Sequence, residues 1–164
     1  MNIRKATPSD YEFIYKIALI TWEATYSSIL LEVQLNYMMD LMYSREAIET
    51  QMTVKGHQFY MVEDETATPF GFCSYEINNE PGKTKIHKLY ILPQTHGKGA
   101  GRALVSLVEH AANNNGNTSI ILNVNRFNPA YDFYLKVGFL NRGEVNVDIG
   151  NGYLMEDYLM EKPL

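Results

Sequence analysis

A run of alternating glycines between a strand pattern and a helix pattern limits the fold more than any other feature. Residues 84–92 read as a strand that Pro93 ends, and Gly97, Gly99 and Gly101 follow it. An apolar stripe at helical spacing begins inside the glycine run: Ala100, Ala103, Leu104, Leu107, Val108, Ala111 and Ala112. Backbone N–H groups at a helix start carry partial positive charge, and glycines leave them uncovered. The segment therefore predicts a helix N-terminus that can hold a pyrophosphate, with a ligand-free turn as the alternative.

Two other phosphate loops fit this segment poorly. A P-loop needs Lys-Ser or Lys-Thr after its last glycine, whereas Gly101 is followed by Arg102 and Ala103. A dinucleotide fingerprint needs its third glycine one residue later and an acidic residue about 20 positions on, where this chain has Ile120-Ile121-Leu122. Both interpretations fail.

The rest of the chain alternates between the two periodicities. Before the glycine run we expect a strand at 2–6, a helix that Thr7 and Pro8 begin, and a helical stretch at 31–53 interrupted near Tyr43-Ser44. Strands at 59–62 and 70–77 precede the strand at 84–92. After the long helix come a strand at 119–124, a short helix from Asn128 to Val137, and closing strands at 139–147 and 153–160. The predicted class is α/β (α+β), with one mixed, mostly antiparallel, twisted sheet of six to seven strands and helices on both faces.

Size and composition indicate one globular domain over residues 1–164. The net charge of −5 favours cationic partners over nucleic acid. No stretch approaches the roughly 20 apolar residues of a membrane span, and the N-terminus has no apolar run typical of a signal peptide. A single cysteine, Cys73, agrees with a reducing compartment. We therefore expect a cytoplasmic protein without nucleic-acid or membrane partners.

Two segments resemble the GNAT acetyltransferase superfamily. Gln94-Thr95-His96-Gly97-Lys98-Gly99 matches that family's signature of Gln or Arg, two residues, Gly, one residue, and Gly or Ala. Asn128-Pro129-Ala130-Tyr131-Asp132-Phe133-Tyr134, followed by Gly138-Phe139, is similar to a second family element. The resemblance covers most of the chain from Phe59 onward and implies the GNAT fold, with acetyl-CoA as acyl donor and no metal.

The resemblance also implies which residues bind the cofactor. Ile91 and Leu92 would hold the pantetheine arm through their backbone, in the manner of an added strand. Asn128 would contact the cofactor arm or cap its helix, and the two roles can coexist. The remaining expected contacts lie in and beside the loop: Gln94, His96, Gly97, Lys98, Gly99, Ala100, Gly101 and Arg102.

Acid and base candidates follow from the chemistry of amine acetylation. Tyr134 resembles the family's general acid, which protonates the coenzyme A sulfur, although an aromatic packing role is the alternative. His87 stands where relatives often place a glutamate base, but it could equally face solvent while bulk water takes the proton. Cys73 fits a buried small residue better than a nucleophile. The other histidines, His57, His96 and His110, show no metal-ligand spacing.

The expected activity is acetyl transfer from acetyl-CoA to a primary amine by direct attack in a ternary complex. Segments 22–26, 34–42 and 155–160 loosely resemble bacterial spermidine/spermine N-acetyltransferases, so a polyamine or other small cationic amine is the expected partner, and a homodimer is compatible with this. Alternatives are a protein or peptide amine, a non-catalytic acyl-CoA-binding regulatory module, and a nucleotide-binding regulatory domain. The residues that might line an acceptor site are Trp22, Glu23, Tyr26 and Tyr37, each of which also suits an ordinary packing or surface role.

Overall fold

A computed structural model describes residues 1–164 and contains one seven-stranded sheet in the order β1-β2-β3-β4-β5-β7-β6. The strands are β1 (Asn2–Lys5), β2 (Gln58–Glu63), β3 (Pro69–Glu80), β4 (Lys83–Ile91), β5 (Ser119–Asn125), β6 (Leu140–Gly150) and β7 (Tyr153–Pro163). The helices are α1 (Tyr11–Tyr26), α2 (Glu32–Tyr43), α3 (Arg45–Thr53), α4 (Ala100–Asn114) and α5 (Ala130–Lys136), with short 3-10 turns η1 (Pro8–Asp10) and η2 (Pro93–Thr95). The expected mixed, mostly antiparallel sheet is confirmed.

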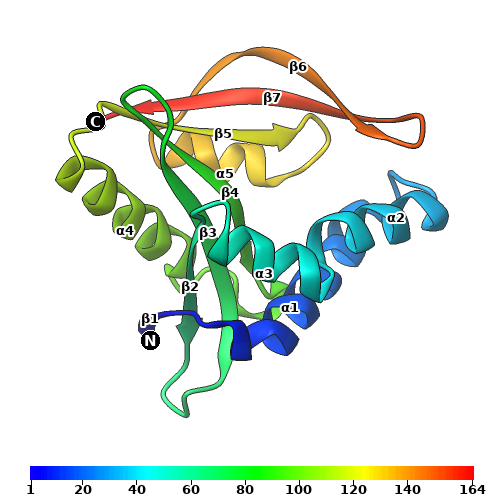
Figure 1. Ribbon diagram of the computed structural model, residues 1–164, viewed down its shortest axis with the longest axis horizontal. Coiled ribbons are helices and arrows are strands. Elements are labelled where there is room, and N and C mark those ends of the chain that lie inside the picture. The colour runs from blue at the N-terminus through cyan, green and yellow to red at the C-terminus, as the bar shows by residue number, and fades with distance from the viewer.

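Helices cover both faces of the sheet, as predicted. Helices α1 to α3 pack on one face through a buried cluster that includes Trp22, Tyr43 and Phe72. Helices α4 and α5 pack on the other face through a second cluster that includes Leu104 and Phe139. Figure 1 shows the two groups of helices on opposite sides of the central strands.

The sheet opens between its two parallel strands. Residues Lys83–Ile86 of β4 pair with residues Ser119–Leu122 of β5. Beyond that point the two strands continue without pairing with each other. A register shift between β3 and β4 pairs Ser74 with Lys88 and Tyr75 with Ile86, so His87 is an extra, bulged residue. A bulge bends its strand, and here it stands where β4 leaves β5. The result is a wedge-shaped opening, the splay, between the ends of β4 and β5.

The predicted elements are confirmed, and the differences lie at their ends. The break between the second and third helices falls at Ser44, whose Oγ accepts from the Ala47 N–H at 3.2 Å. Helix α1 begins at Tyr11, after the 3-10 turn that Pro8 opens, and runs to Tyr26. Strand β3 extends to Glu80 because it forms a hairpin in which Glu80 pairs with Lys83. Such ends depend on partners elsewhere in the chain.

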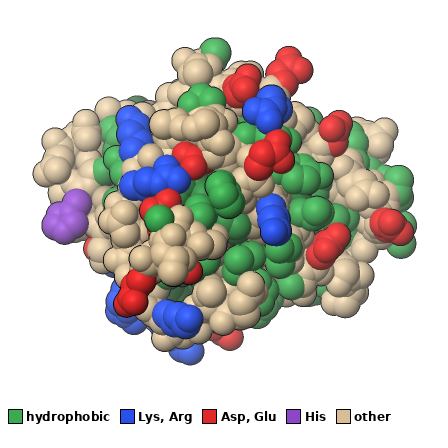
Figure 2. Space-filling view, turned by 90° about the horizontal axis from the view of Figure 1, so that it is seen from below, with side chains coloured by type: hydrophobic (Ala, Val, Ile, Leu, Met, Phe, Trp, Pro, Cys, Tyr) green, Lys and Arg blue, Asp and Glu red, His purple; other side chains and the backbone are tan.

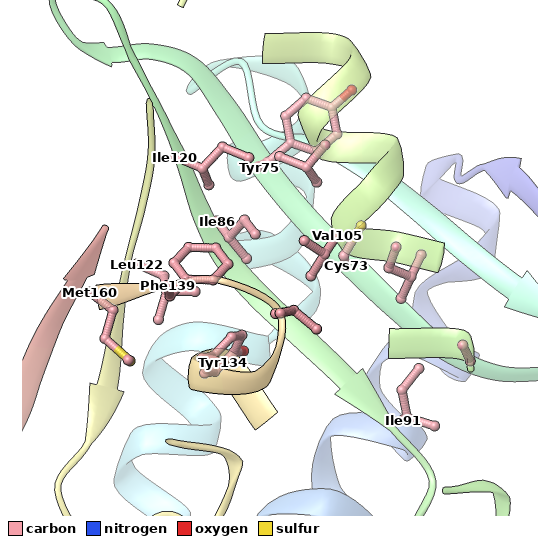
Figure 3. Close-up of a cluster of buried hydrophobic side chains, with 14 of the residues drawn as sticks. Cys73, Tyr75, Ile86, Ile91, Val105, Ile120, Leu122, Tyr134, Phe139 and Met160 are labelled. Atoms are coloured by element: carbon pink, nitrogen blue, oxygen red, sulfur yellow. The ribbon is translucent and has the colours of Figure 1, made fainter. Parts of the chain in front are cut away.

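The cluster beneath α4 and α5 reaches the splay (Figure 3). Tyr134 packs edge-on against Phe139 at a ring separation of 5.6 Å, beside Met160 of β7. Cys73 is buried there as expected, and burial raises the pKa of its thiol to about 12. None of the helices has the length and apolar character that a membrane crossing needs.

Candidate active site

The glycine loop presents a row of unused amides at the start of α4. Gly97 and Gly99 adopt φ angles of +83° and +81°, a region that residues with a Cβ rarely enter. The first backbone bond of the helix runs from the Ala103 N–H to the Gly99 carbonyl at 3.0 Å, and no N–H between residues 97 and 102 donates to a backbone carbonyl. These donors fit a diphosphate group.

The side chains of the loop differ in their exposure. Gln94, His96, Lys98 and Arg102 are exposed, and a ring nitrogen of His96 lies 2.9 Å from the Ile91 carbonyl oxygen. Ala100 is buried under the loop. A Cβ on Gly101 would stand 3.0 Å from the Phe133 ring, so this glycine lets α4 approach α5. The loop and α5 are therefore neighbours.

The edge of β4 that faces the splay pairs with no strand beyond Ile86, and on it the Ile91 carbonyl oxygen contacts only the His96 ring nitrogen. Leu92 donates to the Phe70 carbonyl at 2.9 Å, and its own carbonyl accepts from Thr95. Because alternate residues of a strand point their peptide groups to opposite edges, the peptide groups of Ile91 and Leu89 point toward β5. The structure thus brings Ile91 to the splay, while the peptide groups of Leu92 are used inside the fold.

Tyr134 projects from α5 into the same region. Tyr134 is 7% exposed, and no hydrogen bond to its hydroxyl affects the pKa of the phenol. Burial raises the pKa of the phenol well above its ordinary value, and nearby Tyr90 and Cys73 add to that effect. The hydroxyl is therefore a protonated group with a proton to donate.

Asn128 joins the start of α5 to the end of α1. Its Oδ1 accepts from the Ala130 N–H at 2.9 Å, which is a capping bond, and its Nδ2 donates to the Tyr26 hydroxyl at 3.1 Å. The capping role is present in the structure. Tyr26, an expected acceptor-site residue, is thereby fixed at the rim of the splay.

His87 belongs to a separate cluster on the α1–α3 face. Its Nε2 lies 2.9 Å from Glu76 Oε2, and its ring stacks on His57 with centroids 3.9 Å apart. Burial and then His57 lower the pKa of His87 to about 4, while burial and then Lys88 lower that of His57 to about 4. The structure therefore brings the predicted base together with His57 and Glu76, a partnership that the linear spacing of the histidines did not indicate.

This histidine pair predicts acid sensitivity. Both folded-state pKa values lie below the ordinary 6.5, so the unfolded chain binds more protons between pH 6.5 and 4. The stabilisation from the two neutral histidines should be fully present above pH 6.5 and fall by on the order of 5 kcal/mol as the pH drops to 4. Urea unfolding across this range measures it. Replacing both His57 and His87 with glutamine should flatten the slope, whereas replacing exposed His110 should not.

Strands β6 and β7 form a hairpin that extends past the splay to α2. Its tip reaches α2, where the Tyr37 hydroxyl donates to the Ile149 carbonyl at 2.8 Å and the Tyr37 ring packs on Tyr153. Figure 1 shows the hairpin extending toward α2. Figure 2 shows the molecule from below the view of Figure 1, the end away from the hairpin, where apolar side chains lie at the centre of the face with acidic and basic side chains around them. Tyr26, Tyr37 and the tip of the hairpin thus lie together on the α1–α3 face of the sheet, opposite the face that α4 covers.

Sequence reasoning missed one buried carboxylate near the splay. Asp157 of β7 is 4% exposed and pairs in register with Asn125 at the end of β5. The available signal was weak, because β7 also carries Glu156, Glu161 and Lys162, and only the pairing of Asp157 with Met155 on one face of the strand indicated an inward position.

A parallel pair that opens beside a helix with unused N-terminal amides is the architecture of an acyl-CoA-dependent transferase. A family model described as an acetyltransferase (GNAT) domain matches residues 30–158. The uncharacterized N-acetyltransferase YuaI of Bacillus subtilis (strain 168) is 26% identical over 160 residues, 95% of this chain and 90% of that protein. The chain therefore belongs to the GNAT family. It is an N-acetyltransferase, and its acyl donor is acetyl-CoA.

Solved structures agree with this assignment. The PaiA N-acetyltransferase of Thermoplasma acidophilum, in complex with coenzyme A, superposes with a TM-score of 0.83 at 25% identity, over 99% of this chain and 98% of that one. A spermidine N-acetyltransferase SpeG chimera from Vibrio cholerae and hSSAT gives a TM-score of 0.67 at 20% identity, over 99% and 96% of the two chains. The second likeness concerns the fold alone.

Proposed function

We propose that this enzyme acetylates the primary amine of a small cationic molecule, with polyamines first among the candidates, by direct attack in a ternary complex. The splay between β4 and β5 carries the proposal because the glycine loop begins α4 on one face of the sheet, while Tyr26, Tyr37 and the tip of the hairpin lie on the other face, where we place the acceptor. Donor and acceptor can therefore enter from opposite sides. The net charge of −5 suits a cationic acceptor.

The chain's own groups have distinct parts in this proposal. When bound, acetyl-CoA supplies an acetyl group activated as a thioester. Amides 97 to 102 hold its diphosphate, with Gln94, His96, Lys98 and Arg102 around them. The free edge of β4 at Ile91 aligns the pantetheine arm, with Leu92 and Asn128 beside it. Tyr134 supplies a proton at its hydroxyl.

The decisive experiment incubates the protein with acetyl-CoA and a panel of amines, and measures released thiol. We expect release above the hydrolysis blank with spermidine or spermine, and less with amino acids. Release with peptides alone would favour a protein or peptide amine as acceptor. Coenzyme A binding without release in any arm would identify a non-catalytic acyl-CoA-binding module and contradict the proposal.

The glycine loop gives a separate prediction about coenzyme A affinity. Valine at position 99 must either adopt φ near +81° or rearrange the loop, so Gly99→Val should weaken coenzyme A binding at least tenfold by calorimetry. Gly116→Val is the matched control, since Gly116 has φ +70° beyond the other end of α4. Equal affinities in the two variants would remove the loop from the binding site.

Further expectations extend this proposal. We propose that residues 1–164 form one acetyltransferase domain and that the enzyme acts in the cytoplasm. A homodimer stays a prediction, which light scattering would test.

A further inference from the structure

Asp157 is a buried carboxylate without a partner. Its side chain makes no hydrogen bond, and Oδ1 is sealed from solvent. The nearest cation is engaged elsewhere, because Arg126 donates to Asn146 Oδ1 at 2.6 Å and lies 3.5 Å from Glu144 Oε2. Only the backbone carbonyl of Asp157 receives a bond from Arg126, at 3.3 Å. An unpaired buried charge is costly, so this group is suited to a cationic ligand or a proton.

The carboxylate lies on the α1–α3 face of the sheet, the face on which we place the acceptor. Met160 and Tyr158 of β7 pack with the α4–α5 cluster, and Met155 packs with the α1–α3 cluster. Because side chains alternate along a strand, Asp157 shares the α1 face with Met155. Tyr134 approaches the splay from the α5 face. The two groups therefore stand on opposite sides of the opening.

Titratable neighbours place Asp157 beside the tyrosines of the splay. After burial, which is the main cause, the charge of Asp157 contributes to raising the pKa values of Tyr26 of α1 and Tyr90 of β4. Burial raises the pKa of Asp157 itself to about 6. The positive charges of Arg126, before α5, and Lys85 of β4 lower that pKa, but burial has the larger effect. Tyr90 in turn contributes to raising the pKa of Tyr134.

We propose that Asp157 binds the ammonium group of the acceptor and then accepts its proton, so that it serves as the catalytic base. A primary ammonium supplies the missing charge and three donors. In the reaction the amine nitrogen bonds to the acetyl carbon while the carbon–sulfur bond breaks. The ammonium first gives one proton to Asp157 and becomes the neutral amine that attacks. The Tyr134 proton then passes to the sulfur, and the second proton lost by the nitrogen passes to the Tyr134 phenolate, so that the products are the amide and the free thiol. Asp157 afterwards releases its proton to solvent. This inference rests on the proposed acetylation of a primary amine.

Asp157 meets the needs of a base better than His87. His87 is held against Glu76 and stacked on His57. Asp157 has an acceptor atom without a partner and lies on the α1–α3 side of the splay. A base and an acid whose environments push their pKa values apart are typical of catalytic pairs, and Asp157 and Tyr134 form such a pair.

The test compares Asp157→Asn with wild type in steady-state kinetics with spermidine and acetyl-CoA. We expect kcat/KM for spermidine to fall at least a hundredfold, with coenzyme A affinity unchanged. In wild type, kcat/KM should fall as the pH drops through about 6, because the carboxylate must be ionised to act, and this limb should be absent from the variant. The melting temperature of the variant should match or exceed that of wild type at pH 7, which excludes unfolding as the cause.

Two further variants complete the test. Glu156→Gln removes the same charge from the exposed neighbour on β7 and should leave kinetics unchanged. His87→Gln should keep the acid limb. Loss of that limb in His87→Gln, or full activity in Asp157→Asn, would overturn the assignment while leaving the acetylation itself intact. Absence of turnover by wild type with every amine would instead overturn the proposed function, and this inference with it.

Discussion

Replacing Tyr134 with phenylalanine is expected to lower kcat about a hundredfold and to leave the affinity for coenzyme A within twofold of wild type. The phenol is buried, its raised pKa keeps it protonated, and no hydrogen bond consumes its proton. Phenylalanine keeps the ring and its edge-on contact with Phe139 but removes the hydroxyl. Steady-state kinetics and calorimetry measure the two effects separately.

Tyr131 provides the matched control because it lies on the same helix. Its hydroxyl accepts from Asn141 Nδ2 at 3.2 Å, on the side of β6. Tyr131→Phe should therefore keep wild-type kcat. If Tyr134→Phe also turns over at the wild-type rate, the acid role is wrong and Tyr134 is a packing residue.

Replacing Phe139 with alanine should produce the largest loss of stability. Phe139 is 1% exposed, and its ring contacts the Tyr134 ring within the α4–α5 cluster. Removing a fully buried phenylalanine costs about 3 to 5 kcal/mol through lost burial and the cavity left behind. Chemical unfolding should show this loss, and activity should fall further than the folded fraction because Tyr134 loses its support.

Leu140, next to Phe139 in the chain, is a control that differs from it in burial. Leu140 is 47% exposed at the start of β6, and Leu140→Ala should change the free energy of unfolding by less than about 0.5 kcal/mol. Similar losses in the two variants would mean that the cluster around Tyr134 is not a packed core.

The sequence alone predicted the order of the elements and the glycine loop that begins α4. Both depend on local rules. Period-two and helical spacing distinguish strands from helices, and Gly97 and Gly99 predicted the loop because only glycine adopts their positive φ angles readily. The break at Ser44 was predictable for a similar reason, since a serine side chain caps a helix start.

Tertiary structure alone decided which distant groups meet. His87 looked like an isolated base because its partners His57 and Glu76 stand 30 and 11 residues away in the chain, Glu76 on the neighbouring strand β3 and His57 just before β2. In the sequence Asp157 is one of 19 acidic residues. Only the fold shows that it is buried without a hydrogen-bond partner. Local spacing specifies backbone conformation, whereas the ionisation of a side chain depends on burial and on charges that only strand pairing and helix packing bring together.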